Sequence, residues 1–122
     1  MLQTSGSTTK ILYWFLIVWT VLNLLQGSLT GLHADEAYYW LYSKFLDWGY
    51  FDHPPMVGLF IRAGDVISHS PFGLRFLTIL SSTVSIYVLW LIVKKYHENI
   101  KVFILLFSSI LVFHVYGFIT TP

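Results

Sequence analysis

Cysteine is absent from the 122 residues of this chain, and charged side chains are scarce. Without cysteine the protein has no disulfide scaffold, no thiol nucleophile and no cysteine-ligated metal or iron–sulfur centre. Only 11% of the residues are charged, against about 25% in an average soluble domain. The net charge of +1 provides no basic field to hold nucleic acid, so no nucleic-acid partner is expected.

Hydrophobic residues take the place of the missing charges. They make up 56% of the chain, aromatic residues make up 19%, and the mean hydropathy is +0.67. Three apolar runs approach the roughly 20 residues that a helix needs to cross a bilayer. They cover about residues 11–32, 72–93 and 102–119. The sequence therefore predicts an all-α integral membrane protein with three transmembrane helices.

The basic residues predict how these helices are oriented. Lys10 precedes the first run, and Lys94, Lys95 and Lys101 lie between the second and the third. The loop between the first two runs is acidic instead. Because basic loops stay cytoplasmic, we expect a cytoplasmic amino terminus and an extracytoplasmic acidic loop. The first run is expected to be a retained helix, since it exceeds the apolar core of about 7–15 residues of a signal peptide.

The acidic loop, residues 33–71, has the pattern of two helices lying in the outer membrane interface, at about 35–48 and 54–67. The first has apolar residues at three- and four-residue spacings, which share one helical face. They are Ala37, Trp40, Leu41, Phe45 and Trp48. Gly49 is well placed to end this helix, and Pro54-Pro55 suits the first turn of the next.

Two adjacent carboxylates, Asp35 and Glu36, begin the first of these interfacial helices. In one interpretation Asp35 is the N-cap and Glu36 favours the positive end of the helix dipole. In the other, a carboxylate held at the membrane surface is partly desolvated, which raises its basicity. Such a group can take a proton from an acceptor hydroxyl. The residues alone leave both interpretations open.

The turn that contains Asp52 and His53 is the second candidate site. Asp52 is expected either to cap the following helix or to act with His53. A carboxylate beside an imidazole can bind a divalent metal or a phosphate. Two such groups do not define a metal site, so a divalent metal is a possible cofactor and no cofactor is certain.

The two arginines of the chain, Arg62 and Arg75, fall on the outer side of the membrane. One expectation is that Arg62 pairs with Asp65 three residues on, and that Arg75 anchors its helix at the headgroup boundary. The other is that each binds a lipid or donor phosphate, whose geometry a guanidinium matches. His114, in the third apolar run, is either functional or makes an interhelical hydrogen bond.

The loop contains two segments, His33-Ala-Asp-Glu-Ala-Tyr-Tyr-Trp40 and Gly49-Tyr-Phe-Asp-His-Pro-Pro55, that closely resemble bacterial family 39 glycosyltransferases. This family is related to the protein O-mannosyltransferases, the aminoarabinose transferase of lipid A and the RgtA/B/C/D-like sugar transferases. The resemblance implies a GT-C fold, a multi-helix bundle in the bacterial inner membrane with an extracytoplasmic active site. It also implies transfer of a sugar, with inversion, from a polyprenyl-phosphate carrier to a protein, lipid or glycan hydroxyl.

The resemblance also implies roles for individual residues. Asp35 matches the general base, and Glu36 matches a neighbour that helps to shape the site. Asp52 matches a second acidic residue, which is a metal ligand in some relatives. His53 stands where some relatives carry a lysine that faces the donor phosphate, although a neutral imidazole supplies less charge. Together with Arg62 and Arg75, His53 forms the predicted phosphate-binding set.

Relatives of this family are several times longer and have many more membrane helices. We therefore expect the chain to be the amino-terminal part of a GT-C membrane domain and to be inactive alone. The alternative is a small non-catalytic membrane subunit or lipid-binding scaffold, whose partner is membrane lipid and whose carboxylates only cap helices. A metal-dependent lipid pyrophosphatase ranks last, because the chain offers too few ligands.

Overall fold

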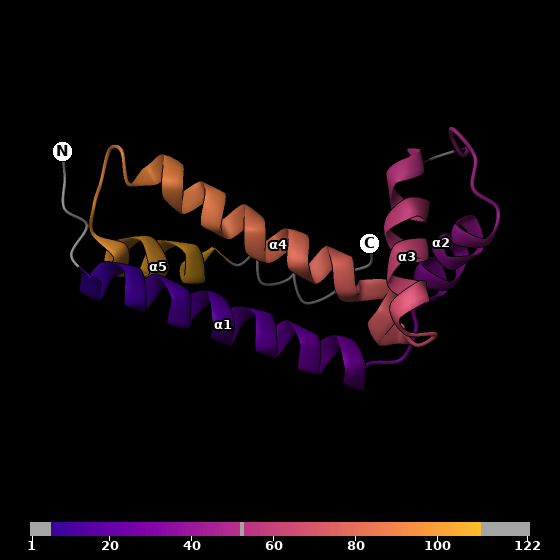
Figure 1. Ribbon diagram of the computed structural model, residues 1–122, viewed down its shortest axis with the longest axis horizontal. Coiled ribbons are helices and arrows are strands. Elements are labelled where there is room, and N and C mark those ends of the chain that lie inside the picture. Colours follow the sequence, from indigo (N-terminus) through magenta and orange to yellow (C-terminus); the bar gives the residue numbers. More distant parts are fainter. Residues whose placement is uncertain (1–5, 52, 111–122) are drawn as a thin grey trace.

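The computed structural model describes residues 6–51 and 53–110, and within them all regular secondary structure is α-helical. Five helices follow one another within these residues (Figure 1). They are α1 (Gly6–Leu29), α2 (Ala34–Lys44), α3 (Pro55–Ile67), α4 (Pro71–Val93) and α5 (Ile100–Ser109). The predicted all-helical class is confirmed for this part of the chain.

The two long helices α1 and α4 lie side by side and run in opposite directions (Figure 1). With 24 and 23 residues, both are long and apolar enough to cross a membrane. Most of each helix faces outward, and large apolar side chains such as Trp14 and Val84 are exposed there. Since soluble monomers seldom expose apolar patches of this extent, the pair is suited to a lipid environment.

The third predicted transmembrane helix is only partly covered by the structure. α5 begins at Ile100, close to the expected start, and ends at Ser109. Ile110 is the C-cap, and residues 111–119 of the predicted span, which include His114, lie outside the described residues. Asn99 caps α5, because its side-chain oxygen accepts hydrogen bonds from the N–H groups of Lys101 and Val102.

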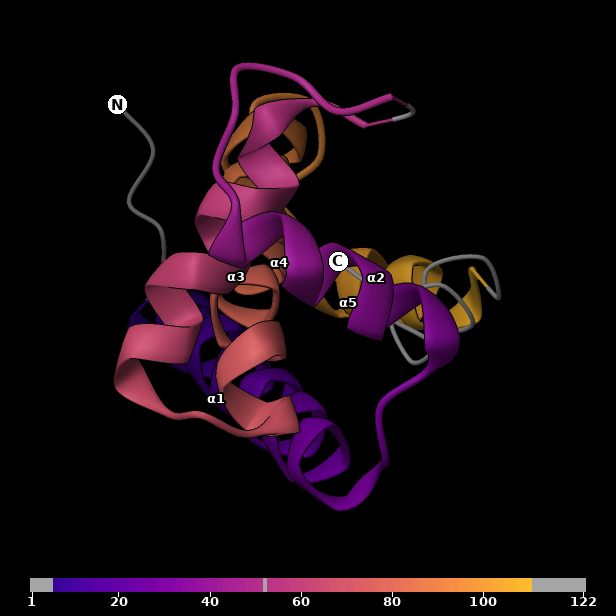
Figure 2. The same ribbon diagram turned by 90° about the vertical axis from the view of Figure 1, so that its right-hand side faces the viewer.

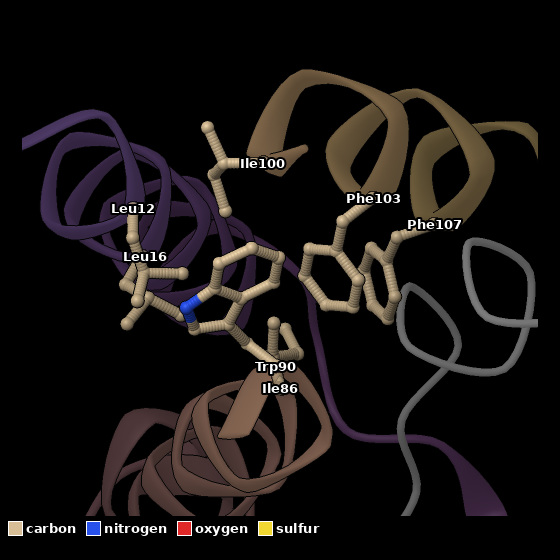
Figure 3. Close-up of a cluster of buried hydrophobic side chains, with 7 residues drawn as sticks. All are labelled: Leu12, Leu16, Ile86, Trp90, Ile100, Phe103 and Phe107. Atoms are coloured by element: carbon tan, nitrogen blue, oxygen red, sulfur yellow. The ribbon is translucent and has the colours of Figure 1, made fainter. Parts of the chain in front are cut away.

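A buried apolar cluster joins α1, α4 and α5 at one end of the molecule (Figure 3). Trp90 of α4 lies between Leu12 and Leu16 of α1 and the phenylalanines of α5 (Figure 3). Its ring centroid is 5.2 Å from that of Phe103, within the range of favourable aromatic pairs. Midway along the bundle, hydroxyl groups join α1 to α4, with the Thr20 and Thr83 oxygens 2.7 Å apart. Such hydrogen bonds tie helices together where apolar burial alone provides no driving force.

Helices α2 and α3 form a hairpin that crosses the opposite end of the α1–α4 pair (Figures 1 and 2). α3 begins at the predicted prolines, with Pro54 as N-cap and Pro55 as the first residue. The N-cap is therefore not Asp52, which lies outside the described residues. The prolines suit this position because the first helical N–H groups have no intrahelical partner.

The prediction that α2 continues to Trp48 and stops at Gly49 is wrong, because the helix ends at Lys44. The Tyr50 ring stacks on Tyr42 with centroids 3.8 Å apart. The Tyr50 hydroxyl donates a hydrogen bond to the Tyr42 carbonyl oxygen at 2.9 Å and accepts one from the Asp47 N–H. Tyr50 thus satisfies backbone groups at the end of α2, and the chain turns back toward α3 early.

Two glycines let the α3–α4 turn close tightly. A Cβ atom built on Gly64 of α3 would overlap the carbonyl oxygen of Gly73 in α4. A Cβ atom built on Gly73 would overlap the carbonyl oxygen of Ser68. In both cases the obstacle is backbone, which cannot move aside as a flexible side chain can. The hairpin therefore sits on α4 at a distance that only glycine permits.

We expect Gly64→Ala to lower the free energy of unfolding by about 1–3 kcal/mol, the usual cost of overpacking. Gly49→Ala is the matched control, because nothing lies within 4 Å of the added Cβ atom. Thermal unfolding of both variants in a mild detergent, followed by circular dichroism, measures the difference. Equal midpoints for the two variants would show that the glycine contact does not limit the packing of α3 on α4.

Candidate active site

A buried ion pair between Glu36 and Arg75 lies where α1, α2 and α4 meet. The exposed fraction is 0% for Glu36 and 4% for Arg75. Arg75 Nε donates to Glu36 Oε1 at 2.5 Å, and Nη2 donates to Oε2 at 2.6 Å. This two-pronged geometry is the strongest form of a guanidinium–carboxylate contact.

The remaining donors of Arg75 reach the carboxyl end of α1. Nη1 donates to the carbonyl oxygens of Gly27 and Thr30 at 2.9 and 3.0 Å, and to the Thr30 hydroxyl. Nη2 donates to the carbonyl oxygen of Gly31 at 2.8 Å. The last carbonyl groups of a helix have no intrahelical partner and attract positive charge. The Arg75 side chain therefore binds both the last carbonyl groups of α1 and, through Glu36, the start of α2.

The amino terminus of α2 is built around Glu36 rather than Asp35. His33 is the N-cap, and its N–H donates to Glu36 Oε2 at 2.9 Å. A glutamate at the third helical position that reaches back in this way is half of a capping box. The expectation that Asp35 is the N-cap is wrong, because Asp35 is the second residue of the helix.

The two adjacent carboxylates consequently have different surroundings. Successive residues of a helix point about 100° apart, so the inward turn of Glu36 leaves Asp35 exposed. Burial raises the pKa of the Glu36 carboxyl, but hydrogen bonds from Arg75 and from the His33 N–H outweigh burial and hold this pKa below its usual value. Glu36 is thus an ionised group enclosed by protein, whereas Asp35 is accessible to a reactant.

His53 lies against the aromatic face of α2. Its Nε2 atom is 2.9 Å from the Tyr39 hydroxyl, and the two ring centroids are 4.7 Å apart. The tyrosine rings of α2 lie close to one another, with the centroids of Tyr38 and Tyr42 4.7 Å apart. The second predicted motif therefore packs on the helix that carries the first. Asp52 lies outside the described residues, and no group of three metal-ligating side chains occurs among residues 6–51 and 53–110.

A second charged cluster joins the two helices of the hairpin. Lys44 Nζ lies 2.6 Å from Asp65 Oδ2, and His69 Nδ1 lies 3.1 Å from Oδ1. The indole N–H of Trp40 points at the same carboxylate, at 3.4 Å. The Lys44 ammonium lowers the pKa of Asp65 to about 2, with further hydrogen bonds from His69 and Trp40 acting against burial.

The expected ion pair between Arg62 and Asp65 is replaced by other contacts. Arg62 Nη1 donates to the carbonyl oxygen of Ser43 at 2.9 Å, and the residue that pairs with Asp65 is Lys44. Arg62 is exposed, whereas Arg75 is enclosed. Of the predicted site residues, the structure brings Asp35, Glu36 and Arg75 to one junction. It places His53 and Arg62 along the hairpin.

The profile of the family described as dolichyl-phosphate-mannose-protein mannosyltransferase matches residues 52–122, more than half of the chain. The chain belongs to this family. Membership confirms the resemblance seen in the loop and makes the chain a member of a GT-C glycosyltransferase family.

Among curated proteins, lipid A galacturonosyltransferase RgtD of Rhizobium johnstonii is 42% identical over 53 residues. The aligned region covers 43% of this chain and 11% of that relative. The match thus spans about a tenth of the length of this curated relative. No solved structure matches this chain.

Sequence reasoning missed the partners that hold the hairpin together. Trp40 and Lys44 are four residues apart on α2, and this spacing puts two polar groups on one helical face, which was a usable signal. Asp65 lies in the last turn of α3, and His69 follows the end of that helix. Which of these groups pair depends on where the turn between α2 and α3 falls, and Tyr50 helps to fix that turn.

We expect the Lys44–Asp65 contact to stabilise the protein above pH 4 and to lose its effect in acid. The folded-state pKa of Asp65 is depressed from 3.8 to about 2, so its contribution is present above 3.8 and lost as the pH falls through 2. The difference in unfolding temperature between wild type and Asp65→Asn should therefore shrink across this range. Asp47→Asn, at an exposed carboxylate, serves as control. A pH-independent difference would contradict the assignment.

Proposed function

We propose that this chain forms part of a membrane glycosyltransferase that uses a polyprenyl-phosphate sugar as donor. The acceptor is an extracytoplasmic hydroxyl of a protein, lipid or glycan, and the sugar is transferred with inversion. Family membership supports the transferase class. The name of the matched relative, a lipid A galacturonosyltransferase, makes a lipid the acceptor class to test first.

The observation that carries this proposal is the exposed carboxylate of Asp35 beside the fixed carboxylate of Glu36. In the proposed step, Asp35 takes the proton of the acceptor hydroxyl while the hydroxyl oxygen attacks the anomeric carbon of the donor sugar. The bond from that carbon to the phosphate oxygen breaks, and its electron pair leaves with the carrier phosphate. Attack from the face opposite the leaving group inverts the anomeric centre.

His53 and Arg62 are proposed to face the carrier phosphate. Both belong to the hairpin that carries Asp35, and Arg62 is exposed with one of its amino groups bound to the Ser43 carbonyl. A cationic or hydrogen-bonding group at the leaving phosphate stabilises charge that develops in the transition state. A divalent metal held by Asp52 would serve the same purpose and remains part of the proposal.

The distribution of charge supports an extracytoplasmic site. The hairpin lies at one end of the α1–α4 pair, and the start of α1 and the α4–α5 connection lie at the other (Figure 1). That other end carries four lysines: Lys10, Lys94, Lys95 and Lys101. By the positive-inside rule, the lysine end is cytoplasmic and the hairpin lies on the outer face of the bacterial inner membrane.

We expect Asp35→Asn to lower the rate of sugar transfer by about 100- to 10,000-fold, the usual contribution of a general base. The assay uses membranes that contain the full product of the gene, a radiolabelled polyprenyl-phosphate sugar and lipid A as acceptor. Asp47→Asn is the matched control, because it removes an exposed carboxylate from the same hairpin. Full activity of Asp35→Asn would exclude the general-base role and favour the non-catalytic scaffold.

A further inference from the structure

We propose that Arg75 is a positioning residue for sugar transfer, which fixes the place of Asp35 through Glu36 and does not bind the donor phosphate. This inference rests on the proposed function, because it assumes that Asp35 acts on the acceptor. It gives a role to a buried charged group that the proposed chemistry does not use.

The hydrogen bonds of Arg75 account for all of its donors. A guanidinium has five N–H groups in a rigid planar fork. Nε and one Nη2 hydrogen bind the two oxygens of Glu36, and the other Nη2 hydrogen binds the Gly31 carbonyl. The two Nη1 hydrogens bind acceptors at Gly27 and Thr30. A donor phosphate would have to displace one of these acceptors from a site that is 4% exposed.

The same contacts fix the orientation of α2. Glu36 is held from one side by Arg75 and from the other by the backbone N–H of its own N-cap, His33. Because both carboxylate oxygens are held, α2 cannot rotate about its axis without breaking a charged contact. Asp35 precedes Glu36 directly on this helix, so any rotation would move its carboxylate by a similar angle.

An arginine is required for this arrangement, and a lysine does not replace it. The lysine ammonium is a point charge with three donors, and it lacks the planar fork. It can pair with Glu36 or approach the α1 carbonyl groups, but it cannot meet both carboxylate oxygens and three backbone oxygens at once. Arg75→Lys therefore keeps the charge and loosens the position of α2.

The test compares Arg75→Lys with wild type in the full gene product, using the transfer assay with varied donor concentration. We expect kcat to fall roughly 100-fold, the effect of a displacement of about 1 Å at the reacting groups. The KM for the donor should stay within about twofold of wild type. Unchanged kcat would overturn the proposal, and so would a large rise in donor KM at unchanged kcat, which is the signature of a phosphate ligand.

A double variant separates positioning from general stability. If Arg75 acts only through Asp35, adding Arg75→Lys to Asp35→Asn should not slow the reaction further, because the two changes remove one shared effect. Multiplying losses would contradict the proposal. Glu36→Asp gives an independent measurement if Arg75→Lys does not fold, because it keeps the charge and shortens the link by one methylene group. It should also lower kcat without raising donor KM.

These results distinguish the inference from the proposed function. An active Asp35→Asn variant removes the general-base assignment itself. An inactive Asp35→Asn variant together with a fully active Arg75→Lys variant leaves the general base in place and removes only the role of Arg75.

Discussion

The buried pair of Glu36 and Arg75 is the interaction on which the rest of the structure depends. Taking two opposite charges out of water costs several kcal/mol per ion, which only good geometry and additional hydrogen bonds offset. Both conditions are met, because the guanidinium binds both carboxylate oxygens and three backbone carbonyl groups of the α1 end. Loss of either partner leaves an uncompensated charge where three helices meet.

This pair gives two neighbouring carboxylates different surroundings. Glu36 is enclosed and ionised, and Asp35 is exposed one helical step away. A reactive group mounted on a helix whose own rotation is restrained is better placed than one on a loop. The buried ion pair thus restrains the helix that carries the exposed carboxylate of Asp35 at one end of the α1–α4 pair.

Different forces hold the hairpin in place. Glycine contacts bring α3 against α4, and the Lys44–Asp65 pair joins α3 to the last residue of α2. At its turn, Tyr50 binds the last carbonyl groups of α2 and stacks on Tyr42. The α1–α4 pair below it is joined by hydroxyl contacts and by the Trp90 cluster, so the hairpin rests on a fixed base.

The sequence by itself determined the elements whose signals are local. Apolar runs gave α1 and α4, because hydrophobic length is a property of one segment, and Pro54-Pro55 placed the start of α3. The two loop motifs also identified the family. Tertiary structure alone decided where α2 ends and which groups pair. Arg75 meets a carboxylate 39 residues earlier and Lys44 meets one 21 residues later, and no local periodicity encodes such distant contacts.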